Sequence, residues 1–171
     1  EAAREISAPL IEDKNQVLTV SVPAEPVYLK ADRVRLTQSL ANLLNNASRY
    51  TDKGGRIWLA ANKEGETVAL RVHDTGIGIA KDKLGTVFDK FTQADSSITR
   101  MYGGTGLGLA IAQACVMKMG GTIEVESQPG VGTTFTFTLP LQNSGKPSSA
   151  GGFAINNASA APDNNKHVLL V

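Results

Sequence analysis

The sequence predicts an α+β fold, a two-layer sandwich in which a mixed, mainly antiparallel sheet carries helices on one face. Segments with alternating apolar and polar residues occur in pairs joined by short turns, which is typical of antiparallel hairpins. Segments with apolar residues three and four positions apart lie between those pairs, which indicates amphipathic helices. Hairpins mixed with helices, without an internal repeat, favour this layered class.

The first thirty residues are expected to form one helix and two extended segments. Glu1–Lys14 is predicted to be a helix interrupted at Pro9, because proline lacks the backbone donor that a helix needs. Val17–Val22 alternates in the manner of a strand, and Val27–Leu29 is a shorter extended segment.

A long helix is predicted next, from Arg33 to about Tyr50, with Asp32 as a suitable N-cap residue. At about 100° per residue, one side is apolar and the other carries polar side chains. The apolar stripe is Leu36, Leu40, Leu43, Leu44 and Ala47, and the polar side is Asn42, Asn45, Asn46 and Arg49. Amide oxygens can ligate Mg²⁺ and an arginine can bind phosphate, but an ordinary solvated helix face explains the same pattern.

Two hairpins and a second helix complete the predicted fold. The expected strands are Arg56–Lys63 with Thr67–Asp74, and Thr122–Gln128 with Thr133–Leu139, the latter pair turning near Pro129-Gly130. The helix is expected from about Gly106 to Met119, closed by Gly120-Gly121.

The composition excludes several classes of protein. Seventeen Lys and Arg residues against sixteen Asp and Glu give a net charge of +1, without the basic cluster of a nucleic-acid or membrane-surface binder. Cys115 is the only cysteine, so an internal disulfide is impossible and a reducing compartment, the cytoplasm, is expected. No apolar run approaches the roughly 18 residues of a membrane span, so any membrane anchor of a parent protein would lie outside this sequence.

Three regions are predicted along the chain. Residues 1–141 form the folded domain. Residues 142–165 are expected to be a flexible linker, because 19 of the 23 residues in Asn143–Asn165 are Gly, Pro, Ser, Ala or Asn. Residues 166–171 resemble the opening of a buried strand, which predicts a further domain, although a dangling tail would fit as well. Both ends are expected to belong to a longer protein.

A carboxylate and two glycines follow a predicted strand at Asp74-Thr75-Gly76-Ile77-Gly78. A carboxylate at a strand end can accept a hydrogen bond from the amino group of adenine, whereas guanine presents a carbonyl at that position. Glycines let the backbone approach a flat base. A plain surface turn is the alternative for this segment taken alone.

A second glycine-rich segment, Gly103–Leu109, leads into the second predicted helix. Glycines at a helix start can expose backbone N–H groups to a phosphate, although one such loop is a weak signal. Phe88–Phe91 is expected to anchor a loop on the core. The polar stretch Thr92–Tyr102, which includes Arg100, is predicted to be a lid that orders over a nucleotide.

In this order, the segments resemble the four sequence boxes of sensor histidine kinases. Asn42–Tyr50 resembles the N box, Asp74–Gly78 the first glycine box, Phe88–Phe91 the F box and Gly104–Leu109 the second glycine box. Gly132-Thr133-Thr134-Phe135 is similar to the closing motif of the family. The resemblance covers residues 1–141 and implies the Bergerat sandwich, shared with DNA gyrase, heat-shock chaperones and mismatch-repair ATPases.

The resemblance also implies roles for individual residues in binding ATP and Mg²⁺. Asn46, with Asn42, would hold Mg²⁺; Arg49 would contact phosphate, and Arg100 would add charge from the lid. The base pocket would comprise Tyr50, Asp74, Gly76, Gly78, Ile79 and Thr133. The phosphate cradle would comprise Gly104, Thr105, Gly106, Leu107, Gly108 and Leu109. Many members carry Lys where Arg49 stands and Phe where Tyr50 stands.

The family transfers phosphate to a histidine on a dimerisation domain, and neither His73 nor His167 has the expected setting. The resemblance therefore implies that the acceptor lies on a separate domain of the same kinase. The strand opening at 166–171 is similar to the start of a receiver domain, as in hybrid kinases.

Two other functions fit the same fold, an ATP-hydrolysing machine and a nucleotide-binding module without transfer activity. The hydrolases place a glutamate where Asn42 stands, as general base for water, and asparagine cannot take up that proton. The box residues are all present, which argues against a module that has lost activity.

Overall fold

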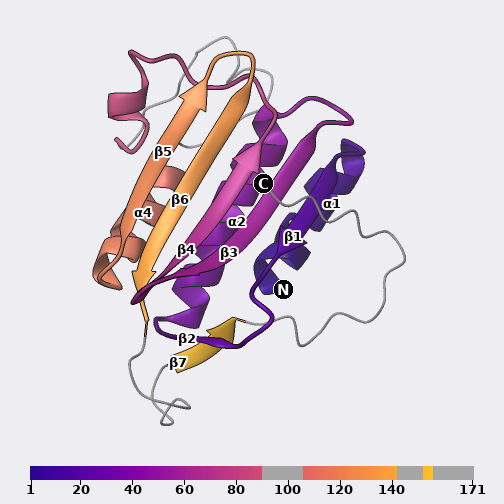
Figure 1. Ribbon diagram of the computed structural model, residues 1–171. Coiled ribbons are helices and arrows are strands. Elements are labelled where there is room, and N and C mark those ends of the chain that lie inside the picture. Colours follow the sequence, from indigo (N-terminus) through magenta and orange to yellow (C-terminus); the bar gives the residue numbers. More distant parts are fainter. Residues whose placement is uncertain (90–105, 142–151, 156–171) are drawn as a thin grey trace.

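The computed structural model describes residues 1–89, 106–141 and 152–155, and these form a two-layer sandwich (Figure 1). The elements are α1 (Ala2–Asp13), β1 (Val17–Ser21), β2 (Val27–Lys30), α2 (Arg33–Tyr50), β3 (Arg56–Glu64), β4 (Thr67–Asp74), η1 (Leu84–Thr86), α4 (Gly108–Lys118), β5 (Thr122–Gln128), β6 (Gly132–Pro140) and β7 (Gly152–Ile155). The helices α1, α2 and α4 lie on one face of the main sheet (Figure 1).

The main sheet has five strands in the order β1-β3-β4-β6-β5. β1 runs parallel to β3, and the other neighbours are antiparallel, which confirms the predicted mixed, mainly antiparallel sheet. Its register places Asp74 between Ile57 on β3 and Thr133 on β6. The ends of β4 and α2 and the β5–β6 turn therefore gather at one end of the sandwich (Figure 1).

The core lies between the sheet and the helices. On β4, Val68, Leu70 and Val72 face inward and are at most 2% exposed. From α2, Leu36, Leu43 and Leu44 meet them with the same degree of burial. The alternation of β4 and the spacing of α2 thus bury one side of each element and leave the polar side of α2 outside the core.

The first helix differs from the prediction, because α1 continues through Pro9 without interruption. Proline removes one backbone donor from the helix. However, Ala3, Ser7 and Ile11 are buried on both sides of it, along the face that packs against α2. Tertiary packing therefore keeps the two halves in one helix.

A small second sheet lies at the other end of the sandwich, where β2 pairs with β7 (Figure 1). The register is antiparallel, with Val27 opposite Ile155 and Lys30 opposite Gly152. β7 falls inside the segment whose composition predicts a linker, so four of those residues form a strand. The boundaries of the linker and of a following domain stay predictions.

Candidate functional site

The polar side of α2 presents three of the predicted residues along consecutive turns. Asn42, Asn46 and Arg49 are all partly exposed, whereas the opposite side of the helix is in the core. The helix begins at a regular cap, because the Asp32 carboxylate accepts a hydrogen bond of 3.0 Å from the backbone N–H of Arg35. Spacings of three and four residues bring the three side chains to one surface.

The N-terminus of α4 lies against this surface. The side-chain nitrogen of Asn42 donates to the carbonyl of Gly108 at 3.3 Å. This bond leaves the amide oxygen of Asn42, the atom that can ligate a metal. No side chain caps α4. Gly106, two residues before the helix begins, has a φ of +66°. An uncapped helix start that contacts Asn42, on a face of α2 that also carries Asn46 and Arg49, suits an anion together with a cation.

Asp74 ends β4 inside the protein and is 4% exposed. Its Oδ1 accepts from the backbone N–H of Gly76 at 2.8 Å. Burial raises the pKa of Asp74, against the lowering effects of the Gly76 hydrogen bond and the nearby His73. In the parts of the chain that the structure describes, no Lys or Arg forms an ion pair with this carboxylate.

Glycine is required at positions 76 and 78 because a side chain at either position would clash with a backbone carbonyl of the protein. A side chain on Gly76 would meet the carbonyl oxygen of Tyr50 and, at 2.8 Å, Oδ1 of Asp74. Gly78 has a φ of +70°, and a side chain there would strike the carbonyl of Gln128. In addition, the N–H of Ile77 donates to the carbonyl of Tyr50 at 3.1 Å, so the Asp74–Gly78 loop is tied to the end of α2.

Ser127 was missed by sequence reasoning. Its hydroxyl accepts from the N–H of Ile79 at 2.8 Å, donates to the carbonyl of Gly132 at 2.8 Å and lies 2.9 Å from the hydroxyl of Thr133. Thr133 is 6% exposed and is paired with Asp74 across β4 and β6. Ser127 thus links the loop after β4 to the strand that carries Thr133, and no motif marks it in the sequence.

The structure brings most of the predicted residues to one end of the sandwich. Tyr50 and Ile79 are partly buried, and both are tied to this end by backbone bonds, Tyr50 through its carbonyl to Ile77 and Ile79 through its N–H to Ser127. Leu107 and Leu109 flank the first residue of α4. Arg100, Gly104 and Thr105 lie outside the described residues, as does the whole predicted lid, Thr92–Tyr102. Their roles stay predictions.

Residues 31–143 match the family described as histidine kinase-, DNA gyrase B-, and HSP90-like ATPase. The chain belongs to this family. Within it, the circadian input-output histidine kinase CikA of Synechococcus elongatus is 47% identical over 113 residues. That alignment covers 66% of this chain but 15% of CikA, so the chain spans a small part of the relative it matches.

Solved structures place the domain among the histidine kinases of this family. The mycobacterial sensor histidine kinase MprB has a TM-score of 0.70 and 26% identity, with 82% of this chain and 94% of that chain covered. Full-length ShkA in complex with AMPPNP has a TM-score of 0.72 and 32% identity, with 87% and 31% covered. The fold and relatives identify a histidine-kinase catalytic domain of the ATP-binding type. No helix among the described residues has the length and apolar character to cross a bilayer.

Proposed function

We propose that this domain binds Mg-ATP between α2, the end of β4 and the start of α4, and that it donates the γ-phosphoryl group to a histidine on a separate dimerisation domain. The observation that carries the proposal is Asp74, a buried carboxylate with a raised pKa and no ion pair with a Lys or Arg among the described residues. A buried carboxylate needs donors, and the amino group of adenine is one.

The base and the phosphates of ATP would contact different elements of the fold. Asp74 accepts from the adenine amino group, and Tyr50 packs against the ring, while Thr133 supports the base end from β6. Arg49 and the N–H groups at the start of α4 bind phosphate oxygens. The amide oxygens of Asn42 and Asn46 would hold Mg²⁺, which neutralises phosphate charge when it is bound. The imidazole nitrogen of the acceptor forms the new bond to phosphorus, the bond to the β-phosphate oxygen breaks, and ADP leaves.

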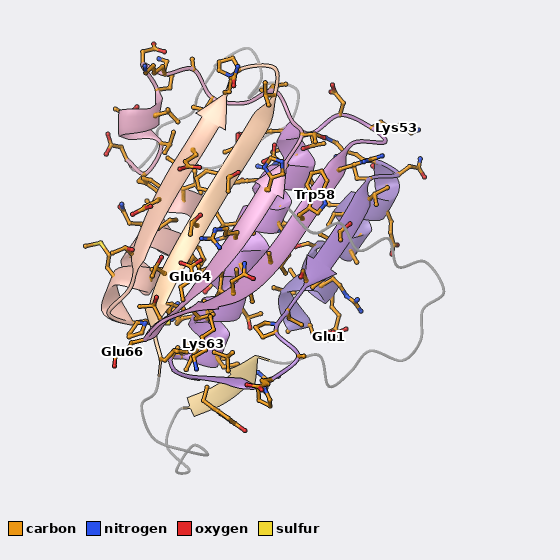
Figure 2. The ribbon with its side chains drawn as sticks, viewed as in Figure 1. Glu1, Lys53, Trp58, Lys63, Glu64 and Glu66 are labelled. Atoms are coloured by element: carbon orange, nitrogen blue, oxygen red, sulfur yellow. The ribbon has the colours of Figure 1, made fainter. Side chains whose placement is uncertain are left out.

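Transfer to histidine is favoured over hydrolysis because α2 contains no Asp or Glu to act as a base for water. His73 does not suit the role of acceptor. Its ring stacks on Trp58 with centroids 4.9 Å apart, and its Nδ1 is 2.9 Å from the hydroxyl of Thr134. His73 therefore lies on the sheet face opposite the core-facing Asp74 (Figure 2 shows Trp58 on that face).

The test uses labelled ATP with the full chain, alone and with the purified dimerisation domain of the same parent. Alone, the chain should bind ATP, hydrolyse it slowly and acquire no stable label. With the dimerisation domain, label should appear on that domain as phosphohistidine, which is labile in acid and stable in base. Rapid turnover by the chain alone would instead support the hydrolase function, and tight binding without transfer would support a binding module.

The proposal extends to the region after the domain. Residues 166–171 are inferred to begin a receiver domain that takes the phosphoryl group in turn, with residues 142–165 as the connection. The sequence of the parent protein beyond Val171 tests this, because a receiver requires acidic residues directly after that first strand.

A further inference from the structure

The C-terminal end of α2 is closed by side chains from a distant part of the chain. The last carbonyls of a helix have no partner within the helix. Here the ammonium of Lys14 donates to the carbonyls of Ser48 at 2.9 Å, Arg49 at 2.7 Å and Thr51 at 3.0 Å. The side-chain nitrogen of Gln16 donates to the carbonyls of Ser48 at 2.9 Å and Thr51 at 2.8 Å.

This arrangement replaces the usual glycine cap. Thr51, which follows α2, is extended, with φ −96° and ψ 137°. Gln16 is 8% exposed, and its side-chain oxygen accepts from the hydroxyl of Ser48 at 2.6 Å, so both ends of its amide are bonded to α2. Between the two capping residues, Asn15 adopts a φ of +48°, which turns the chain between α1 and β1.

The capped turn is the same turn that carries residues of the nucleotide site. Arg49 and Tyr50 lie in it, and the carbonyl of Tyr50 holds the N–H of Ile77. Gly76 approaches the same carbonyl so closely that a side chain would not fit. A continuous path of contacts therefore runs from Lys14 through the end of α2 to the loop that follows Asp74.

We propose that Lys14 and Gln16 are positioning residues for the nucleotide site, which fix the last turn of α2 so that Arg49, Tyr50 and the Asp74–Gly78 loop are aligned for ATP. The inference rests on the proposed function of that site. An ammonium group is suited to this place because the negative end of the helix dipole and three carbonyls converge on it. Burial lowers the pKa of Lys14, as expected for a cation drawn into the protein rather than left in solvent.

The experiment compares Lys14→Met, Lys14→Arg and Lys53→Met with the wild-type chain. Lys53 is exposed in the loop after α2 (Figure 2), so Lys53→Met loses the same charge close by without removing the cap. ATP affinity is measured by calorimetry, amide hydrogen exchange by NMR and unfolding by urea. Lys14→Met should weaken ATP binding about five- to tenfold, and Lys14→Arg should recover most of it, because a guanidinium can also donate to several carbonyls. Lys53→Met should bind like the wild type.

Hydrogen exchange separates positioning from general stability. In Lys14→Met, exchange should accelerate at the amides of Thr51 and Ile77, which report the end of α2 and its bond to the loop, while β4–β6 amides stay unchanged. Equal acceleration throughout the sheet, or unchanged ATP affinity in a folded Lys14→Met, would overturn the inference. If Lys14→Met does not fold, Gln16→Met serves as the test variant with the same expected and contrary results.

Failure of the proposed function gives a different pattern. If the wild-type chain does not bind ATP at all, the nucleotide site itself is wrong. In that case the amide exchange rate of Ile77 still tests whether Lys14 aligns the loop after Asp74. An Ile77 rate in Lys14→Met equal to that of the wild type would overturn the alignment too.

Discussion

The two ends of the proposed nucleotide site are built differently. At the base end, Asp74 and Thr133 face each other across paired strands, and both are nearly inaccessible. Ser127 bonds the neighbouring loop to the same strands. At the phosphate end, Asn42, Asn46 and Arg49 project from one helix and are partly exposed. The base end is set by backbone pairing, whereas the phosphate end is set by side chains.

This difference indicates that the base end is the more rigid part of the site. Strand register, close backbone contacts and buried hydrogen bonds allow little adjustment, so the base end is ready before a ligand arrives. Partly exposed side chains on a helix have more rotamer freedom to lose than backbone groups in paired strands, and that entropy is lost when a phosphate binds. Substitutions at the base end should therefore act by steric exclusion or lost polarity. Substitutions at the phosphate end should change ATP affinity by smaller steps, and the size of the change should depend on the Mg²⁺ and salt concentrations.

The largest effect is expected from Gly76→Ala. The new methyl group meets the carbonyl of Tyr50 and Oδ1 of Asp74, so the loop has to move away from α2. Overpacking of this kind costs about 1–3 kcal/mol or more, and ATP affinity should fall about a hundredfold. Gly85→Ala is the matched control, because nothing lies within 4 Å of a side chain there. Calorimetry on both variants measures the effect, and similar affinities would mean that the base end is not rigid.

The second largest effect is expected from Asp74→Asn, which should lower ATP affinity about ten- to hundredfold. The substitution turns one hydrogen-bond acceptor into a donor. The stability of the free domain should respond in the opposite direction. The pKa of Asp74 is raised by burial above its ordinary value of 3.8. The folded state therefore holds this proton more tightly, and wild-type stability falls as pH rises from the unfolded pKa through the folded pKa.

The amide introduced by Asp74→Asn does not titrate, so the variant should gain stability relative to the wild type across that pH window and keep the gain above it. Urea denaturation between acidic and neutral pH, without nucleotide, measures the difference. A variant that is weaker in binding and also less stable at neutral pH would contradict a buried carboxylate held for a ligand.

Asn46→Ala tests the phosphate end and should have a moderate effect. It should remove most of the Mg²⁺ dependence of ATP affinity, with a loss of about five- to tenfold at saturating Mg²⁺. Asn62→Ala is the control, because it makes the same chemical change at an exposed position on β3, away from α2. Calorimetry with and without Mg²⁺ distinguishes the two. Equal Mg²⁺ dependence in Asn46→Ala and the wild type would assign the metal to another ligand.

Ser127→Ala should give the smallest effect. The N–H of Ile79 loses its acceptor and Thr133 loses a neighbouring hydroxyl, which should weaken ATP binding about threefold. Ser21→Ala, at the exposed end of β1, is the control. If Ser127→Ala matches Asn46→Ala in Mg²⁺ dependence, the division between a base end and a phosphate end fails.

Much of this architecture is legible in the sequence. Asp32 and the apolar spacing predicted α2 with its observed bounds, and the alternation of apolar and polar residues predicted β4 with its observed bounds. The predicted site residues within the described regions do gather at one end of the sandwich. These features are local, since each depends on residues a few positions apart.

What could not be predicted depends on contacts between distant segments. Lys14 and Gln16 act on carbonyls more than thirty residues away, and backbone carbonyls leave no mark in a sequence. The hydroxyl of Ser127 accepts from Ile79, which lies in a loop nearly fifty residues earlier in the chain. The continuity of α1 through Pro9 comes from packing on α2, and the pairing of β7 with β2 joins segments that no motif relates.

The stack between Trp58 and His73 gives the domain a built-in optical probe. Trp58 is the only tryptophan in the chain, so all indole emission arises from one place on β3. Its neighbour across the strand pair is His73, which directly precedes Asp74. Emission from Trp58 therefore reports the strand that ends at the proposed base pocket, without a dye and without disturbing the ligand.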